Sequence, residues 1–222
     1  MNDDLKQVIY DYLLLNCASP IRWFSEREIA EALQIKRSAV RETLIFMEGE
    51  GIVSKVPQRG YRCIDYSQDD MRALQLLRFT LEHSAVMKAL TAAQSKDIEQ
   101  LIEIKKEMDQ AFDAEDINTY MLSDMKFHAA LIDASHDHLM KKIFSTMKLA
   151  LYASGKNKVI SSDAMHRTHQ AHQQIFDAFI ARNFSALEQA LCDHIGGGNS
   201  GSVAAIERLT TLANAAAVSC KS

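Results

Sequence analysis

Glycine and proline are scarce in this sequence, which has eight Gly and two Pro among its 222 residues. These residues interrupt helices most strongly, whereas the abundant Ala, Leu, Ile, Met, Glu and Lys favour them. The scarcity excludes collagen-like and low-complexity chains and predicts a mainly helical protein. No apolar run approaches the roughly 20 residues that a helix needs to cross a bilayer, so no membrane segment is expected.

The four cysteines are scattered along the chain without paired spacing, at Cys17, Cys63, Cys192 and Cys220. Neither a disulfide framework nor a cysteine-type zinc finger is indicated. The first residues, MNDDLK, are acidic and polar, unlike a signal peptide. We therefore expect a cytoplasmic protein with reduced thiols. Excess positive charge is also missing, since the net charge is −4, so any basic patch has to be a local feature.

Two helices joined by a short turn are predicted in the first third of the chain. Ser25 followed by Glu28 is a capping box, so the first helix should begin at about Glu26. Residues 34–35 form the turn, and Ser38 is the expected N-cap of the second helix. Apolar residues recur at helical spacing in both segments, which gives each helix a face to bury.

A two-stranded ribbon is predicted directly after the second helix. Gly51 fits the position just past the end of that helix. Residues 52–56 and 61–64 are rich in β-branched and apolar side chains, and the segment Pro57-Gln58-Arg59-Gly60 between them suits a turn. Helix, turn, helix and ribbon together make a winged helix-turn-helix, whose second helix can enter the major groove of DNA.

Positive charges gather on one edge of this segment. Lys36, Arg37 and Arg41 lie where the second helix begins, and Arg59 and Arg62 repeat the sign on the wing. Exposed charge is most often a solvated helix face, which is the alternative to a DNA contact. The clustering of these charges on an acidic protein favours the DNA-binding interpretation.

The stretches SEREIAEALQIKRSAVRETL and EGEGIVSKVPQRGY together resemble the DNA-binding domain of the GntR family of bacterial transcriptional regulators. The resemblance implies DNA contacts from an Arg at the start of the first helix, two Arg around the second helix and the wing tip, which here are Arg27, Arg37, Arg41 and Gly60. With the neighbouring polar residues, the predicted DNA-binding face is Arg27, Lys36, Arg37, Ser38, Arg41, Arg59 and Gly60.

The segment departs from the family pattern at three places. Gln34 stands where the family usually has Gly in the turn, and Lys36-Arg37-Ser38-Ala39 replaces the usual Ser-Arg-Thr-Pro. Ser19-Pro20-Ile21-Arg22 replaces the Pro-Gly pair expected before the first capping box. These differences should leave the fold intact, but the base preference need not follow the commonest family operator.

Helical periodicity follows a predicted domain boundary near residues 65–69. We expect a DNA-binding domain over residues 1–66 and a helical domain over residues 67–222. Helices are predicted at residues 69–92, 96–114, 117–134, 138–154, 163–181, 184–195 and 202–218. Each has an apolar stripe that needs partners, so the expected fold class is mainly α: a winged helix-turn-helix of three helices and a two-stranded wing, followed by an all-α bundle of six to seven helices.

Four residues that can bind metal lie on apolar stripes of the predicted bundle. Asp124 and His128 are four residues apart and therefore share one helix face. His172 and His194 each lie eleven residues from a turn near Asn183, so they should be level in an antiparallel helix pair. A site of three His and one carboxylate suits Zn, Ni, Fe or Mn. A lone inward His is more often a hydrogen-bonded core residue than a ligand, and this alternative applies to each one.

The predicted bundle resembles the ligand-binding FCD domain of the FadR-type branch of the same family, on Arg78, Leu81, Glu82, His172, His194 and the segment DMKFHAALIDAS. This resemblance implies a metal ion held by an Asp and three His. Arg78 can hold the carboxylate of a small organic acid effector, and an ion pair with Glu82 at i,i+4 is the alternative.

We predict a transcriptional regulator that binds double-stranded DNA as a homodimer at an inverted repeat. A small organic acid bound beside a divalent metal ion in the bundle would control its operator affinity. One alternative is an enzyme, because three His and a carboxylate around a metal can activate water in a hydrolase or oxygenase. No inward acid is placed as a general base, however, and the DNA-binding domain would be unexplained. A third interpretation is a metal-sensing regulator, in which the ion itself is the signal.

Overall fold

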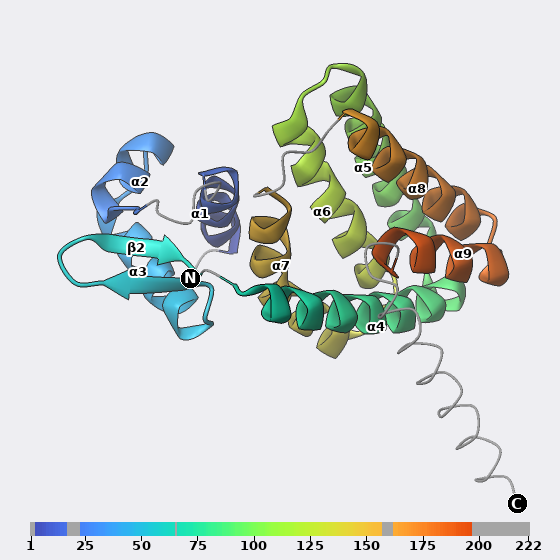
Figure 1. The fold of residues 1–222 in the computed structure, drawn as a ribbon, viewed down its shortest axis with the longest axis horizontal. Coiled ribbons are helices and arrows are strands. Elements are labelled where there is room, and N and C mark those ends of the chain that lie inside the picture. The colour runs from blue at the N-terminus through green and yellow to red at the C-terminus, as the bar shows by residue number, and fades with distance from the viewer. Residues whose placement is uncertain (1–2, 17–22, 65, 157–161, 197–222) are drawn as a thin grey trace, which may run out of the picture.

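The computed structural model describes residues 3–16, 23–64, 66–156 and 162–196. Within these residues the chain is mainly helical, with a single two-stranded sheet near the N-terminus, so the predicted fold class is confirmed. Figure 1 shows a small N-terminal unit, which we call the head, beside a larger helical bundle. None of the described helices is long and apolar enough to cross a membrane.

The head consists of three helices and a wing, in the order α1 (Asp3–Asn16), α2 (Glu26–Leu33), α3 (Arg37–Gly49), β1 (Val53–Val56) and β2 (Gly60–Cys63). The two strands pair antiparallel, with Val53 opposite Cys63 and Val56 opposite Gly60. In Figure 1 the wing projects away from the bundle, while α1 lies on the side that faces it. The buried core of the head is formed by side chains from every one of these elements, including Ile9, Leu13, Phe24, Ile29, Val40, Leu44, Met47, Val53 and Tyr61.

The start of α2 confirms the sequence-based prediction, whereas the start of α3 corrects it. Ser25 Oγ accepts a hydrogen bond from the Glu28 amide at 3.0 Å, and α2 begins at Glu26. Helix α3 begins earlier than expected, with Lys36 as its N-cap and without a side-chain cap. The backbone carbonyl of Lys36 already accepts from the amide of Val40 at 3.2 Å, so the prediction that Ser38 caps this helix was wrong.

Positive φ angles occur in three turns of the head, and two of these positions, Gln34 and Gly60, shape its fold. Gln34, between α2 and α3, has φ 55° and ψ 39°, a conformation that costs a side chain with a Cβ free energy. Gly60, at the start of β2, has φ +102°, and a Cβ there would lie 2.4 Å from the carbonyl oxygen of Phe24. Phe24 and Tyr61 exchange two backbone hydrogen bonds, of 2.7 and 2.9 Å, at this contact. Gly60 is therefore required by the close approach of the wing to the strand-like residue Phe24.

Cys63, at the end of β2, is disulfide-bonded, and Cys192 is free. The expectation that all the cysteines are reduced was therefore wrong for Cys63. Widely separated cysteines give no local pattern from which such a pairing could be predicted.

The bundle contains six described helices and a π-helical turn: α4 (Gln68–Ala92), α5 (Ser95–Asp113), α6 (Ile117–Asp133), α7 (His138–Lys156), α8 (Ser162–Ile180), α9 (Phe184–Leu191) and η1 (Cys192–Gly196). The predicted helix bounds agree to within one or two residues up to α8. The single helix expected over residues 184–195 is instead α9 followed by the π turn. The predicted helix at residues 202–218 lies outside the described residues.

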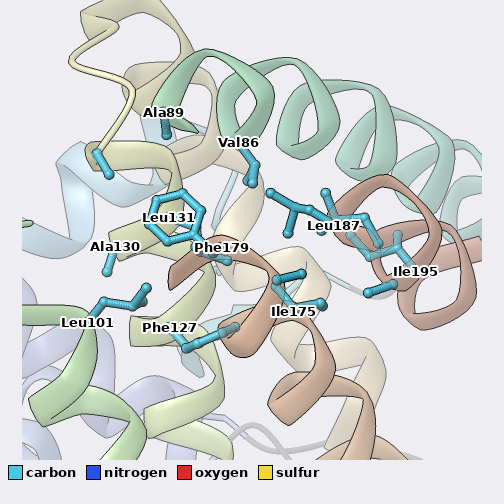
Figure 2. Packing of buried hydrophobic residues seen from close by; sticks show 14 of the residues in the cluster. Val86, Ala89, Leu101, Phe127, Ala130, Leu131, Ile175, Phe179, Leu187 and Ile195 are labelled. Carbon is cyan, nitrogen blue, oxygen red and sulfur yellow. The ribbon is translucent and has the colours of Figure 1, made fainter. Parts of the chain in front are cut away.

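The bundle core is built where α6 and the pair α8–α9 face each other. Figure 2 shows Phe127 and Leu131 of α6 packed with Ile175 and Phe179 of α8 and Leu187 of α9. Each of these five side chains is almost completely buried. Burial of such large apolar groups contributes roughly 1.5–3 kcal/mol per side chain, and it holds the helices that carry the predicted metal ligands in fixed positions.

Candidate metal centre and DNA-binding face

The structure brings the four predicted metal ligands together in the bundle. Asp124, His128, His172 and His194 each offer one ligand atom, and these atoms all lie within 4.8 Å of one another. The Nε2 atom of His128 lies 3.2 Å from Nε2 of His172 and 3.1 Å from Nε2 of His194. Oδ1 of Asp124 lies 2.7 Å from Nε2 of His172. Three ring nitrogens and one carboxylate oxygen therefore converge on one small volume.

Three elements position these side chains. Asp124 and His128 lie one turn apart on α6, and His172 lies on α8. His194 lies on the π turn that extends α9, where the wider turn changes the direction in which the chain presents its side chains. Asn183 caps α9 by accepting from the Ala186 amide, and the hairpin that it starts brings the His172 and His194 rings to a centroid distance of 4.3 Å.

A buried carboxylate sets the orientation of His128. Oε2 of Glu82 lies 2.6 Å from Nδ1 of His128, and Oε1 of Glu82 accepts from Nε of Arg78 at 2.6 Å. The Glu82 side chain is fully buried. Burial by itself raises the pKa of Glu82, but the positive charge of Arg78 and the contact with His128 outweigh it and lower the pKa to about 2. Because Glu82 is ionised and can only accept, Nδ1 of His128 carries the proton, and Nε2 presents its lone pair to the cluster.

His172, the second buried residue of the predicted ligand set, also has a hydrogen-bonding partner on Nδ1. Nδ1 of His172 lies 3.2 Å from the Tyr120 hydroxyl. Burial raises the pKa of Tyr120 far above its usual value, so the phenol stays neutral and serves only as a hydrogen-bonding group. The buried imidazoles of His128 and His172 thus each have a partner on Nδ1, and their Nε2 atoms face each other.

Burial and mutual repulsion keep two of the imidazoles neutral. Burial lowers the pKa of His172, although Asp124 opposes that shift. Burial lowers the pKa of His194 further, and the neighbouring His172 and His128 add to the effect. Burial raises the pKa of Asp124, but its close hydrogen bond with His172 and the positive charge of Arg78 outweigh this, so the net pKa is lowered and Asp124 is ionised. Neutral imidazoles and an ionised carboxylate are the protonation states that bind metals.

The donor set fits a divalent cation. With Nδ1 of His128 directed at Glu82, the Nε2 lone pair of His128 faces two other ring nitrogens at little more than 3 Å. A cation between the nitrogens would satisfy these lone pairs together with the Asp124 carboxylate. Nitrogen and oxygen donors of this kind suit Zn, Ni, Fe and Mn.

Arg78 contacts Glu82 next to the candidate metal centre, and its side chain is largely shielded from solvent. Its Nε donates to Glu82, which is the ion pair that the sequence left as the alternative to effector binding, and its side chain is 16% exposed. The charge of Arg78 nevertheless acts on Asp124, His172 and His194, since it helps to lower the pKa of each. Arg78 therefore adds positive potential at the edge of the cluster.

Most of the predicted DNA-binding residues lie on the surface of the head. All except Gly60 are exposed, namely Arg27, Lys36, Arg37, Ser38, Arg41 and Arg59. On the wing, the guanidinium groups of Arg59 and Arg62 lie 5.6 and 5.8 Å from the centre of the Trp23 ring. On α3, Arg37 and Arg41 both pair with Glu26 of α2. The head thus has exposed cationic groups on α3 and on the wing.

The family described as the FCD domain matches residues 73–197, which is more than half of the chain. This chain belongs to the FCD-domain family, and the curated relatives that it matches are HTH-type transcriptional regulators. The regulator is 26% identical over 191 residues to the HTH-type transcriptional regulator LutR of Bacillus subtilis. The aligned region covers 77% of this chain and 86% of LutR. It is 22% identical over 200 residues to the HTH-type transcriptional regulator YdhC of the same organism, which covers 86% of this chain and 84% of YdhC.

The fold of the regulator matches a solved structure of a putative transcriptional regulator GntR from Rhodococcus sp. RHA1, with a TM-score of 0.73, 18% identity, and coverage of 91% of this chain and 97% of that one. These relatives are named as transcriptional regulators, and none of them is named as a hydrolase or oxygenase.

Three residues around the two sites of the regulator could not be assigned from the sequence. Glu82 was expected only as a partner of Arg78, and neither Tyr120 nor Glu26 was assigned to a site. Glu82 occupies the apolar stripe of α4 that also carries Phe79 and Val86, and an acid on such a stripe is the signal that indicates a buried partner.

Proposed function

We propose that this regulator binds a divalent metal ion through Asp124, His128, His172 and His194, and that a small organic acid bound beside the ion controls its affinity for operator DNA. The observation that carries the proposal is the convergence of three Nε2 atoms and one carboxylate oxygen within 4.8 Å. The buried, oriented state of His128 and His172 adds support, because second partners of this kind are typical of metal-binding imidazoles.

The metal ion would supply positive charge that attracts and binds the carboxylate of the effector. With a charge of +2 and a single ionised ligand, Asp124, the centre retains net positive charge, because Arg78 offsets the charge of the buried Glu82. Arg78 is therefore proposed as an effector-binding residue through its charge. A ligand of this kind changes DNA binding only if it binds one arrangement of head and bundle more tightly than the other.

The proposed DNA-binding domain comprises residues 1–66, with α3 as the recognition helix, and the proposed effector domain comprises residues 67–222. Arg37 and Arg41 would read base edges in the major groove. Arg27, Lys36, Ser38, Arg59 and the wing tip at Gly60 would position the head on the phosphate backbone.

We further propose that the active form is a homodimer at an inverted repeat. One winged head makes too few contacts for specific binding at physiological salt. Exposed apolar side chains lie on α4 and α7, two helices that contact each other: Leu77 is 58%, Leu139 64% and Ile143 42% exposed. A second copy of the chain would cover this face, and sedimentation at micromolar concentration measures the resulting mass.

The metal proposal is tested by elemental analysis of the purified protein and by DNA release. The DNA probe is a duplex enriched from a random library by the wild-type protein, and candidate acids come from a thermal-shift screen of small mono- and dicarboxylic acids. We expect about one metal ion per chain, and release of the duplex when a stabilising acid is added.

A variant that lacks two of the proposed ligands tests whether the metal site is needed for the response to acid. A variant with both His172→Ala and His194→Ala should lose the metal and the acid-dependent release, while the head keeps its weak affinity for DNA. The control is His136→Ala, which removes an imidazole that pairs with Asp97 on the surface. A double variant that retained stoichiometric metal and normal release would rule the site out. Metal affinity near cellular free-ion levels would instead favour the metal-sensing alternative.

A further inference from the structure

Glu26 lies between the two arginines that are proposed to read bases. Its Oε2 atom is 3.1 Å from Nε of Arg37, and its carboxylate binds Nε and Nη2 of Arg41 at 3.0 and 2.9 Å. The Glu26 side chain is only 15% exposed, whereas the side chains of Arg37 and Arg41 are 62% and 56% exposed. One carboxylate at the start of α2 is thus placed behind both guanidinium groups of α3.

The pairing leaves the outer edges of both guanidinium groups available. A guanidinium has five N–H donors, and Glu26 uses only the Nε and Nη2 side of Arg41. The end that carries Nη1 keeps its donors and the fork geometry that matches O6 and N7 of guanine. Arg37 uses only Nε, so both of its terminal nitrogens remain.

We propose that Glu26 is a positioning residue for sequence readout, which holds Arg37 and Arg41 in the orientation that meets base edges. The inference rests on the proposed role of α3 as the recognition helix. A free arginine side chain loses much rotamer freedom when it is immobilised on DNA. Two arginines already fixed by one carboxylate lose less, and they present their forks in a defined direction.

Removing the charge of Glu26 should change DNA affinity in opposite directions, depending on whether Glu26 positions the arginines or only repels DNA phosphates. An acid close to DNA repels phosphates, so its removal should strengthen binding to every sequence. If Glu26 positions the arginines, its removal should weaken binding to the preferred sequence alone. The two accounts therefore predict opposite changes for the same duplex.

The experiment compares wild-type protein with Glu26→Gln, which keeps the side-chain volume. Binding is measured on a duplex enriched from a random library by the wild-type protein and on a random-sequence duplex of equal length. We expect affinity for the enriched duplex to fall about tenfold, within the range for loss of one oriented arginine–guanine pair, while affinity for random DNA stays the same or rises. A library selected again with Glu26→Gln should show weaker base preference at the positions read by the arginines.

The matched control is Glu31→Gln on the same helix. Glu31 also pairs with an arginine, Arg27, at 3.7 Å, but both side chains are largely exposed. This variant removes the same charge, so it should change affinity for both duplexes alike and leave their ratio unchanged. Urea unfolding checks that Glu26→Gln remains folded.

The positioning role would be overturned if Glu26→Gln kept or increased the wild-type ratio of affinity for the enriched duplex to affinity for random DNA. An equal fall in the ratio for Glu31→Gln would also overturn it, because the effect would then follow charge alone. If the wild-type protein enriches no sequence from the library, the proposed function fails, and this inference fails with it.

Discussion

At the scale of single residues, Glu82 connects the proposed metal site to the rest of the bundle. It bonds to His128 on one side and to Arg78 on the other, each at 2.6 Å, and it has no solvent exposure. A carboxylate behind a metal-binding imidazole fixes its tautomer and increases its basicity. Arg78 compensates the charge of Glu82, which would otherwise be costly to bury.

Glu82→Gln should weaken metal binding without removing a ligand. The amide can no longer hold the proton on Nδ1 of His128 as an ionised carboxylate does, so we expect the dissociation constant for Zn²⁺ to rise about 10- to 100-fold. Competition with a chromogenic chelator measures this constant. The control is Glu188→Gln, which removes a carboxylate 3.2 Å from His83 at a partly exposed position. Equal zinc affinity in wild-type and Glu82→Gln protein would contradict the orienting role.

At the scale of elements, the turn between α2 and α3 carries a backbone conformation that its residue disfavours. Gln34 is left-handed at φ 55°, its side chain is exposed, and it replaces the Gly that the resembled family usually has there. The turn is nevertheless held by backbone hydrogen bonds to α2, including the Ile35 amide to the carbonyl of Ala30 at 3.1 Å. The packing of α2 on α3 therefore imposes the turn, and Gln34 bears the strain.

Gln34→Gly should stabilise the protein. A left-handed residue with a Cβ costs roughly 1–2 kcal/mol, and the greater freedom of Gly in the unfolded chain offsets roughly 0.5–1 kcal/mol of that. We expect a net gain of about 0.5–1 kcal/mol in the free energy of unfolding, measured in urea. The same substitution in a helix interior, Gln100→Gly in α5, should instead cost about 1 kcal/mol. A loss of stability in Gln34→Gly would show that the side chain has a contact that outweighs the strain.

The elements also show which features a sequence can predict. Helix α6 is found over Ile117–Asp133 where residues 117–134 were predicted, because its apolar stripe and its neighbours' stripes are local patterns. The four predicted metal ligands lie close together, as the i,i+4 spacing on one helix and the equal distances from one hairpin turn predicted. The π turn at His194 was missed, since it depends on how α9 meets its neighbours. Glu82 and Tyr120 contact their histidines across 46 and 52 residues of sequence, which no periodicity encodes.

At the scale of the whole molecule, α6 carries two of the predicted metal ligands and also contacts the head. One face carries Asp124 and His128, and Met125 belongs to the buried cluster of the head together with Ile9 and Leu13 of α1. Helix α7 makes a second contact, where Nζ of Lys148 lies 5.3 Å from the centre of the Tyr10 ring. Figure 1 shows α1 on the side of the head that faces these helices. A displacement of α6 at the ligand site would therefore act directly on the packing of α1.

Met125→Ala should uncouple the head from the ligand site. The side chain packs in the head cluster at 6% exposure, so its loss should leave metal binding intact but remove the contact that distinguishes one arrangement of head and bundle from the other. Coupling energies between two sites typically change affinity about 5- to 150-fold. In Met125→Ala we expect the ratio of affinities for the enriched duplex without and with acid to fall toward one. The control is Met108→Ala, which truncates an equally buried methionine of the bundle core away from the head and should keep the coupling despite a similar loss of stability. If Met125→Ala retained the full acid-dependent release while metal and acid binding were normal, communication through α6 would be excluded.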